Sequence, residues 1–187
     1  MTALHITGDE AADALLSEDP LALLIGMLLD QQIPMETAFA GPAKLRDRLP
    51  SFDAATLADA DDLEAVFRAS PAVHRFPGSM AGRVQALAGA VRDDWGGDAS
   101  AIWRRDDPDG AEVLRRLKAL PGFGDQKARI FLALLGKRGH TSAAGWREAA
   151  GEYGEEGFRS VADITSPESL TKVREFKQAR KAAAKSG

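Results

Sequence analysis

The chain has 187 residues, enough for one sizeable hydrophobic core or for two small lobes that share one. It contains no cysteine, which excludes a disulfide, a thiolate nucleophile and an iron–sulfur cluster. No apolar run approaches the ~20 residues of a membrane span, and the start of the chain has neither the basic nor the apolar block of a signal peptide. We therefore expect a cytoplasmic protein with no membrane partner.

The net charge of −4 argues weakly against a nucleic-acid partner, but the charge is unevenly distributed. Residues 1–110 carry 9 basic and 19 acidic side chains, whereas residues 111–140 carry 7 basic and 2 acidic ones. Because salt screens charge over about 8–10 Å, the local field counts for more than the total. The basic segment is compatible with duplex binding; the alternative is a solvated helix face followed by a charged tail.

Residues 1–14 predict a loop or a short leading helix. Asp19-Pro20 is typical of an N-cap and a first helical position, and residues 21–29 follow as a broad apolar stripe, which indicates a central helix. That helix ends in Asp30-Gln31-Gln32, whose polar groups must be satisfied internally or face something outside the fold. Pro34 opens the next helix, which Gly41-Pro42 should bend or divide.

Residues 53–69 have the pattern of a surface helix or of two short ones. The apolar positions from Val84 to Trp95 recur at helical spacing, and Gly96-Gly97 should end that helix before a shorter one near residues 101–103. No stretch alternates with period two for long enough to suggest a sheet. The chain is therefore predicted to be all-α.

Residues 113–135 predict a helix, a tight glycine turn and a second helix, because helically spaced apolar residues stand on both sides of Pro121-Gly122-Phe123-Gly124. Gly122 and Gly124 tolerate positive φ and let another backbone approach closely. The N–H groups of Gly124, Asp125 and Gln126 would be free donors at the positive end of the second helix. Such a place suits a phosphate group.

Beyond the turn, Thr141-Ser142 could cap a helix that runs through Trp146 to Tyr153 and is broken at residues 154–157. Ser166-Pro167 should start the last helix. Its apolar half precedes its basic half, so we expect the first half to dock and the second to fray.

Three segments together resemble the HhH-GPD superfamily of base-excision DNA glycosylases, which includes endonuclease III and the 3-methyladenine glycosylases. The stretch from Leu120 to Ala128, LPGFGDQKA, resembles the family's helix-hairpin-helix. Residues 30–34, DQQIP, resemble its LSQQ-type segment, and residues 81–87 resemble its KAxxL helix. Their order and separations also match, and together they cover roughly residues 15–140.

The resemblance implies a two-lobed helical fold. Residues 20–135 would form a six-helix-barrel-like lobe that contains the helix-hairpin-helix at about 111–135, and residues 1–19 and 136–187 would form the second lobe. It further implies a cytoplasmic, nucleoid-associated monomer that binds double-stranded DNA at a damaged or mismatched base, without a metal or another cofactor.

The resemblance also implies a role for each matching residue. Gln32 would enter the space that a flipped nucleotide leaves, and Trp146 is a candidate to stack on the extruded base. The residues expected to contact DNA are Gln31, Gln32, Gly122, Phe123, Gly124, Gln126, Lys127 and Arg129.

The chain departs from the family at the catalytic positions. The position of the family's aspartate falls on residues 143–146, which hold no carboxylate, so Glu148 and Asp30 are the candidate catalytic acids. The position of the lyase lysine is held by Gln126, which argues against Schiff-base chemistry. We therefore expect a monofunctional glycosylase. The alternatives are a catalytically reduced lesion sensor and a protein-docking module, and the sequence does not specify which base is recognised.

Overall fold

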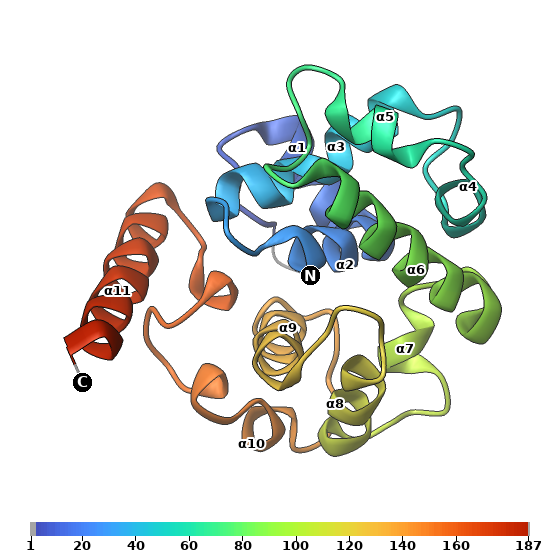
Figure 1. Ribbon diagram of the computed structural model, residues 1–187. Helices are drawn as coiled ribbons and strands as arrows, with labels where there is room; N and C mark the ends of the chain where they lie inside the picture. The colour runs from blue at the N-terminus through green and yellow to red at the C-terminus, as the bar shows by residue number, and fades with distance from the viewer. Residues whose placement is uncertain (1–2, 187) are drawn as a thin grey trace.

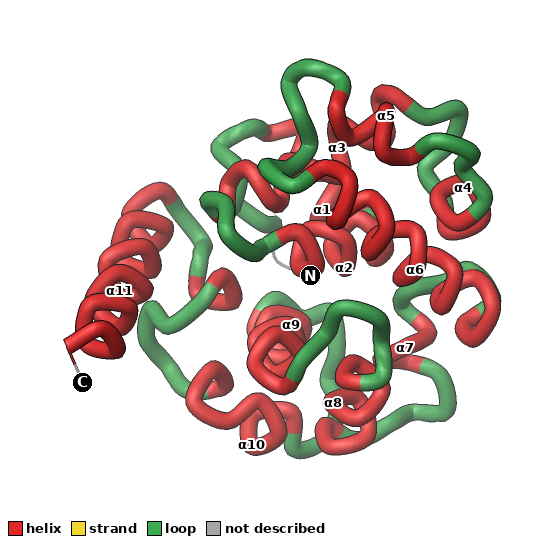
Figure 2. Tube along the Cα trace, in the orientation of Figure 1, coloured by secondary structure: helices red, strands yellow, loops and turns green. Residues whose placement is uncertain are grey.

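The computed structural model describes residues 3–186, and within that range every regular element is a helix (Figures 1 and 2). This confirms the all-α prediction. The α-helices are α1 (Glu10–Glu18), α2 (Pro20–Leu29), α3 (Met35–Arg48), α4 (Ala54–Ala58), α5 (Leu63–Arg68), α6 (Pro77–Trp95), α7 (Ala101–Arg104), α8 (Gly110–Lys118), α9 (Asp125–Lys137), α10 (Trp146–Ala150) and α11 (Pro167–Ser186). Two short 3-10 helices, η1 (Gly151–Gly154) and η2 (Val161–Asp163), join α10 to α11.

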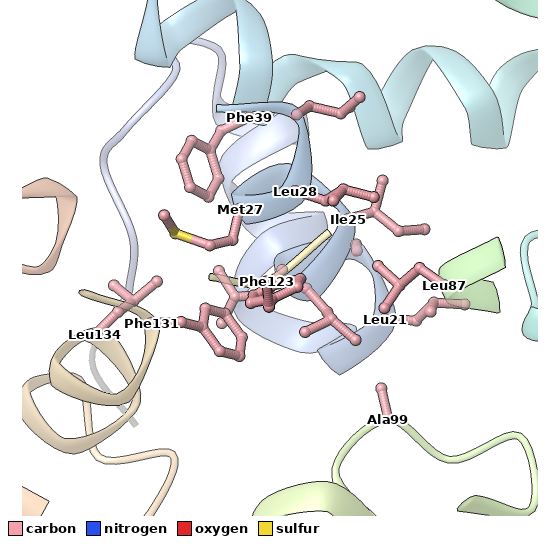
Figure 3. Close-up of a cluster of buried hydrophobic side chains, with 14 of the residues drawn as sticks. Leu21, Ile25, Met27, Leu28, Phe39, Leu87, Ala99, Phe123, Phe131 and Leu134 are labelled. Atoms are coloured by element: carbon pink, nitrogen blue, oxygen red, sulfur yellow. The ribbon is translucent and has the colours of Figure 1, made fainter. Parts of the chain in front are cut away.

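Helix α2 lies at the centre of the fold. The Asp19 carboxylate accepts hydrogen bonds from the N–H groups of Leu21 and Ala22, and Pro20 occupies the first helical position, as predicted. Every residue from Leu21 to Leu29 is buried, so the helix is apolar on all sides. Figure 3 shows side chains from α2, α3, α6 and α9 meeting around it.

The remaining amino-terminal helices surround α2. Helix α3 packs along it and continues through Pro42, so of the two expected effects of Gly41-Pro42, a bend or a division, the division does not occur. Residues 53–69 form the two short helices α4 and α5, which pack on α6. Helix α6 ends at Trp95 with Gly96 in the left-handed conformation (φ 64°), which confirms the predicted end.

The predicted helix–turn–helix is formed by α8, the segment 119–124 and α9. Phe123 is buried in the turn and packs edge-on against Phe131 of α9, at a ring-centroid distance of 6.0 Å. Helix α9 contacts α2, α8, α10 and η2. It therefore links the central helix to the carboxyl-terminal part of the chain.

The carboxyl-terminal segment differs from the expectation in two respects. Helix α10 begins at Trp146, after a left-handed Gly145, and not at a Thr141-Ser142 cap, because Thr141 Oγ1 accepts only a local bond from the Ala143 N–H. It ends at Ala150. Helix α11 remains helical as far as Ser186, although residues 177–186 are all exposed, so the predicted fraying was wrong.

Helix α1 makes its main contacts with α2 and α3, whereas α10, η1 and η2 pack against α8 and α9, and α11 packs on η2. The amino- and carboxyl-terminal helices thus have different neighbours. No helix within residues 3–186 combines the length and the apolar character of a membrane span.

Candidate nucleic-acid interface

The glycine bend between α8 and α9 lies on the surface. Gly122 has a φ of 83°, and a Cβ at this position would overlap the Leu28 side chain, so only glycine fits. Gly124 is exposed and has no atom within 4 Å of where its Cβ would stand. Gly124 is also the N-cap of α9 and offers no side-chain acceptor to the first-turn amides. The bend therefore presents free backbone donors to an approaching anion.

Charged side chains beside the bend are partly paired. Asp125, in the first turn of α9, contacts Arg129 at 2.8 Å and Lys118 at 3.1 Å, and the hydrogen bond from Arg129 lowers the pKa of this carboxyl. Arg129 Nη1 also donates to the Ala149 carbonyl at 2.6 Å. Gln126 is exposed and donates to the Tyr153 hydroxyl at 2.9 Å. The two cations offset the charge of Asp125 at the place where a phosphate is expected.

Lys127 points toward the end of α2. Its Nζ donates to the Leu28 carbonyl at 2.8 Å and to Gln31 Oε1 at 3.2 Å. Burial lowers the pKa of Lys127 to about 8, although the charge of Asp30 opposes the shift. The lysine thus ties the hairpin to the loop after α2. Its ammonium is engaged in these two bonds, whereas the resemblance to the glycosylase family implies that it contacts DNA.

The loop after α2 is held from two sides. Lys127 holds Gln31 on one side. On the other, His74 Nε2 donates to the carbonyls of Leu29 at 3.2 Å and Gln31 at 3.1 Å, while its Nδ1 accepts from the Phe76 N–H at 3.0 Å. This pattern requires a neutral ring, and burial lowers the pKa of His74 accordingly.

The same loop presents Gln32 to solvent. Gln32 has a φ of 61°, an uncommon conformation for a residue with a side chain. Such strain persists only where the surroundings impose it, and the bonds from Lys127 and His74 supply that constraint. Phe76, an exposed aromatic side chain, stands two residues after His74. His74 therefore connects the backbone next to Gln32 with the backbone of Phe76, and the side chains of Gln32 and Phe76 are both exposed.

A cleft of about 490 Å³ opens beside this loop. It lies between the end of α2, α9, the turns η1 and η2, and α11. Its polar lining includes Asp30, Gln126, Tyr153, Arg159, Lys177 and Lys181. Apart from Asp30, the charged side chains of the lining are cations.

Asp30 is the carboxylate of this cleft. Its side chain is only 9% exposed, and within residues 3–186 it accepts no hydrogen bond; its nearest charged partner is Lys177 Nζ, 4.0 Å away. Burial raises the pKa of Asp30, and the charges of Lys177 and Lys127 oppose that shift. The carboxylate is thus shielded from most of the solvent but opens on the cleft, and without a hydrogen-bond donor from residues 3–186 it is available to a ligand there.

Asp163 provides a structural contrast. It is the only aspartate after Asp125 in the sequence, and its Oδ1 contacts Lys137 Nζ at 2.6 Å, with both side chains 6% exposed. Its Oδ2 accepts from the N–H groups of Arg159 and Ser160. This carboxylate is fully paired and holds η2 against α9.

Glu148 lies elsewhere. It is exposed on α10 and lines a separate surface hollow together with Arg147 and Glu152. Trp146 also lies outside the lining of the cleft. Its ring packs where Gly136 leaves room for it, and the Arg147 guanidinium stands 4.5 Å from its ring centroid. Of the two candidate acids, the structure brings only Asp30 to the cleft, and it does not bring Trp146 there.

His74 escaped the sequence analysis because an isolated histidine in a proline-punctuated segment has no recognisable pattern. Among residues 3–186 there is no group of three His, Cys, Asp or Glu side chains placed to hold a metal ion. Comparison of the chain with protein-family models, with curated proteins and with solved structures gives no match. The likeness to the HhH-GPD superfamily therefore rests on the three sequence segments.

Proposed function

We propose that this protein is a DNA-binding base-excision repair protein of the HhH-GPD type that acts, as a monomer, as a monofunctional glycosylase on a damaged or mismatched base. The exposed Gly122–Gly124 bend would hold a phosphate of the duplex. Gln32 would fill the gap left by the extruded nucleotide, and Phe76, whose N–H donates to His74, offers an exposed ring.

The observation that carries this proposal is the state of Asp30. The carboxylate lines the cleft beside the hairpin, is nearly buried and accepts no hydrogen bond within residues 3–186. Cleavage of an N-glycosidic bond develops positive charge on the sugar, which a nearby carboxylate stabilises. In the proposed reaction the bond between sugar and base breaks, water adds its oxygen to the sugar carbon, and the base leaves with a proton. Asp30 either stabilises the cation or accepts the proton of that water.

Schiff-base chemistry at the family's lysine position is disfavoured by the residues on α9. Gln126 occupies the position of the family's lysine, and its amide donates to Tyr153. Lys127 is one residue further on, and its ammonium donates to Leu28 and Gln31. An amine used in this way is poorly placed to attack a sugar carbon in the cleft.

A lesion-binding protein without turnover is the second candidate. The observation that favours it is that residues 143–146, where the family has its aspartate, place no carboxylate in the cleft. Such a protein would use the same bend and the same Gln32 but would not break the glycosidic bond.

The test is an excision assay on duplexes that carry uracil, alkylated bases or oxidised bases. A monofunctional glycosylase releases the free base and leaves an abasic site that is cut only after alkali treatment. Binding without release from any of these duplexes would favour the sensor. A flat dependence of duplex affinity on salt would instead favour a protein-docking module, because phosphate contacts give a slope of roughly −0.9 each.

A further inference from the structure

The last three turns of α11 are helical yet stand clear of the core. On this helix only Ser169 and Val173 are buried, and residues 177–186 are exposed. In Figure 1 the helix stands at the left, at the edge of the molecule. No apolar contact accounts for this part of the helix, so its polar faces are available to a partner.

One of those faces is basic and borders the cleft. Lys177, Arg180, Lys181 and Ala184 all line it, and their spacing of three, one and three residues places them on the same side of the helix. Arg159, next to η2, lines the cleft as well. Four cations therefore surround an opening whose only lining acid, among the residues the structure describes, is Asp30.

Nearby acids neutralise only part of this charge. Glu152 pairs with Arg180 at 2.9 Å and with Arg159 at 3.4 Å. Lys177 reaches no closer than 4.0 Å to Asp30, and Lys181 has no acidic partner within 4.0 Å among residues 3–186. The two lysines therefore retain positive charge that faces the cleft.

The position of this face relative to the hairpin indicates its ligand. Gln126 lines the same cleft, so the first turn of α9, which follows the glycine bend, and the basic face of α11 flank one opening. Helix α11 is also joined to the α2–α3 side by the ion pair Arg174–Glu36, and Lys177 Nζ stands 4.0 Å from Asp30 on that side. A DNA strand that is held at the bend and whose nucleotide enters the cleft would meet Lys177 and Lys181 on the opposite side of the cleft.

We propose that the basic face of α11, formed by Lys177, Arg180 and Lys181, is a second phosphate-binding surface, which holds the backbone of the DNA strand whose nucleotide enters the cleft. This inference rests on the proposed function and extends it, since the hairpin alone would hold the strand on one side only.

The test compares two double variants of the full chain that remove the same charge from the same helix. Lys177→Ala with Lys181→Ala alters the cleft face. The control, Lys172→Ala with Lys185→Ala, alters exposed lysines outside the cleft lining, one of which lies over the Phe158 ring. Alanine favours the helix in all four positions, so both variants should keep α11. The measurement is the affinity for a short duplex with a stable abasic-site analogue over a range of KCl concentrations.

We expect the cleft-face variant to bind more weakly and with a salt slope shallower by roughly 1.8, or roughly 0.9 per lost phosphate contact. The control should keep the slope of the wild type. Equal slopes for the two variants would overturn the α11 assignment, and the proposed function would stand if the wild type still bound in a salt-dependent way. A wild-type protein that binds no duplex would overturn both.

Discussion

The loop after α2 and helix α10 each carry a candidate catalytic carboxylate, and the two carboxylates lie in opposite environments. Asp30 follows the most apolar helix of the chain and remains nearly buried without a hydrogen bond within residues 3–186. Glu148 is on a short surface helix and stays in water. The difference shows that the end of a fully buried helix can carry a polar group into an environment that a surface helix does not provide.

The most decisive way to break this comparison is to neutralise each carboxylate in turn. We expect Asp30→Asn to lower the single-turnover excision rate by about 10²–10⁴-fold, the usual contribution of a positioned acid or base. Glu148→Gln should leave that rate within about twofold of the wild type. If Glu148→Gln abolished excision while Asp30→Asn did not, Glu148 and not Asp30 would be the catalytic carboxylate.

The second prediction concerns Lys127, which links the hairpin to the loop after α2. Its folded pKa of about 8 lies below its ordinary value of 10.5, so between these values the unfolded chain binds more protons than the folded one. Wild-type stability should therefore rise across that pH window, by at most ~2 kcal/mol after allowance for solvent screening. Lys127→Met should lack the rise. Urea unfolding of both proteins over this pH range measures their free energies of unfolding. If the two free energies changed with pH in parallel, burial of the Lys127 amine would not be the cause of the rise.

The third prediction tests the cost of shielding the Asp30 carboxylate from water without a hydrogen bond from residues 3–186. Because the folded pKa of Asp30 is raised, the penalty is present at neutral pH and is relieved as pH falls through the folded pKa toward the ordinary value of 3.8. Asp30→Asn should therefore be more stable than the wild type at neutral pH, by ~1 kcal/mol or about 2–4 °C in Tm. The gain should disappear in acid. A variant less stable than the wild type at neutral pH would mean that the carboxylate has a stabilising partner.

The smallest expected effect belongs to His74. Because its pKa lies below the ordinary value of 6.5, wild-type stability should fall as pH decreases through that value. There the unfolded chain gains a proton on His74, whereas the folded ring uses the same nitrogen to accept from Phe76. We expect a loss of less than ~1 kcal/mol, absent in His74→Gln. Thermal melts of both proteins from neutral to mildly acidic pH measure this loss. Identical pH dependences of Tm would show that His74 does not cause it.

Local signals predicted much of the fold. Asp19-Pro20 gave the start of α2, Gly96 gave the end of α6, and the glycine-rich turn gave the division between α8 and α9. Each of these signals acts through backbone conformation or capping within a few residues, so the sequence contains it directly. The last helix persisted beyond its apolar half because its start was specified locally by Ser166-Pro167 and nothing in its sequence breaks it.

The candidate site was less predictable because it depends on contacts across the chain. The bond from Lys127 to Leu28 spans 99 residues, and the bond from His74 to Leu29 spans 45. Similarly, the Trp146 ring packs against Gly136, and the spacing of residues in the sequence does not predict this contact. Asp30 was a candidate by its position alone. Its burial depends on the packing of α9 and α11 beside the end of α2, which the sequence does not show directly.

The central claim is that the glycine bend holds a phosphate, and the most direct measurement is the duplex affinity of Gly124→Asp. Its φ of −79° suits any residue, open space surrounds the site, and aspartate is a favourable N-cap, so the fold should be retained. Gly89→Asp on α6, also in open space, is the matched control for added charge. We predict that Gly124→Asp binds the duplex at least about tenfold more weakly than Gly89→Asp. Equal affinities would contradict the assignment.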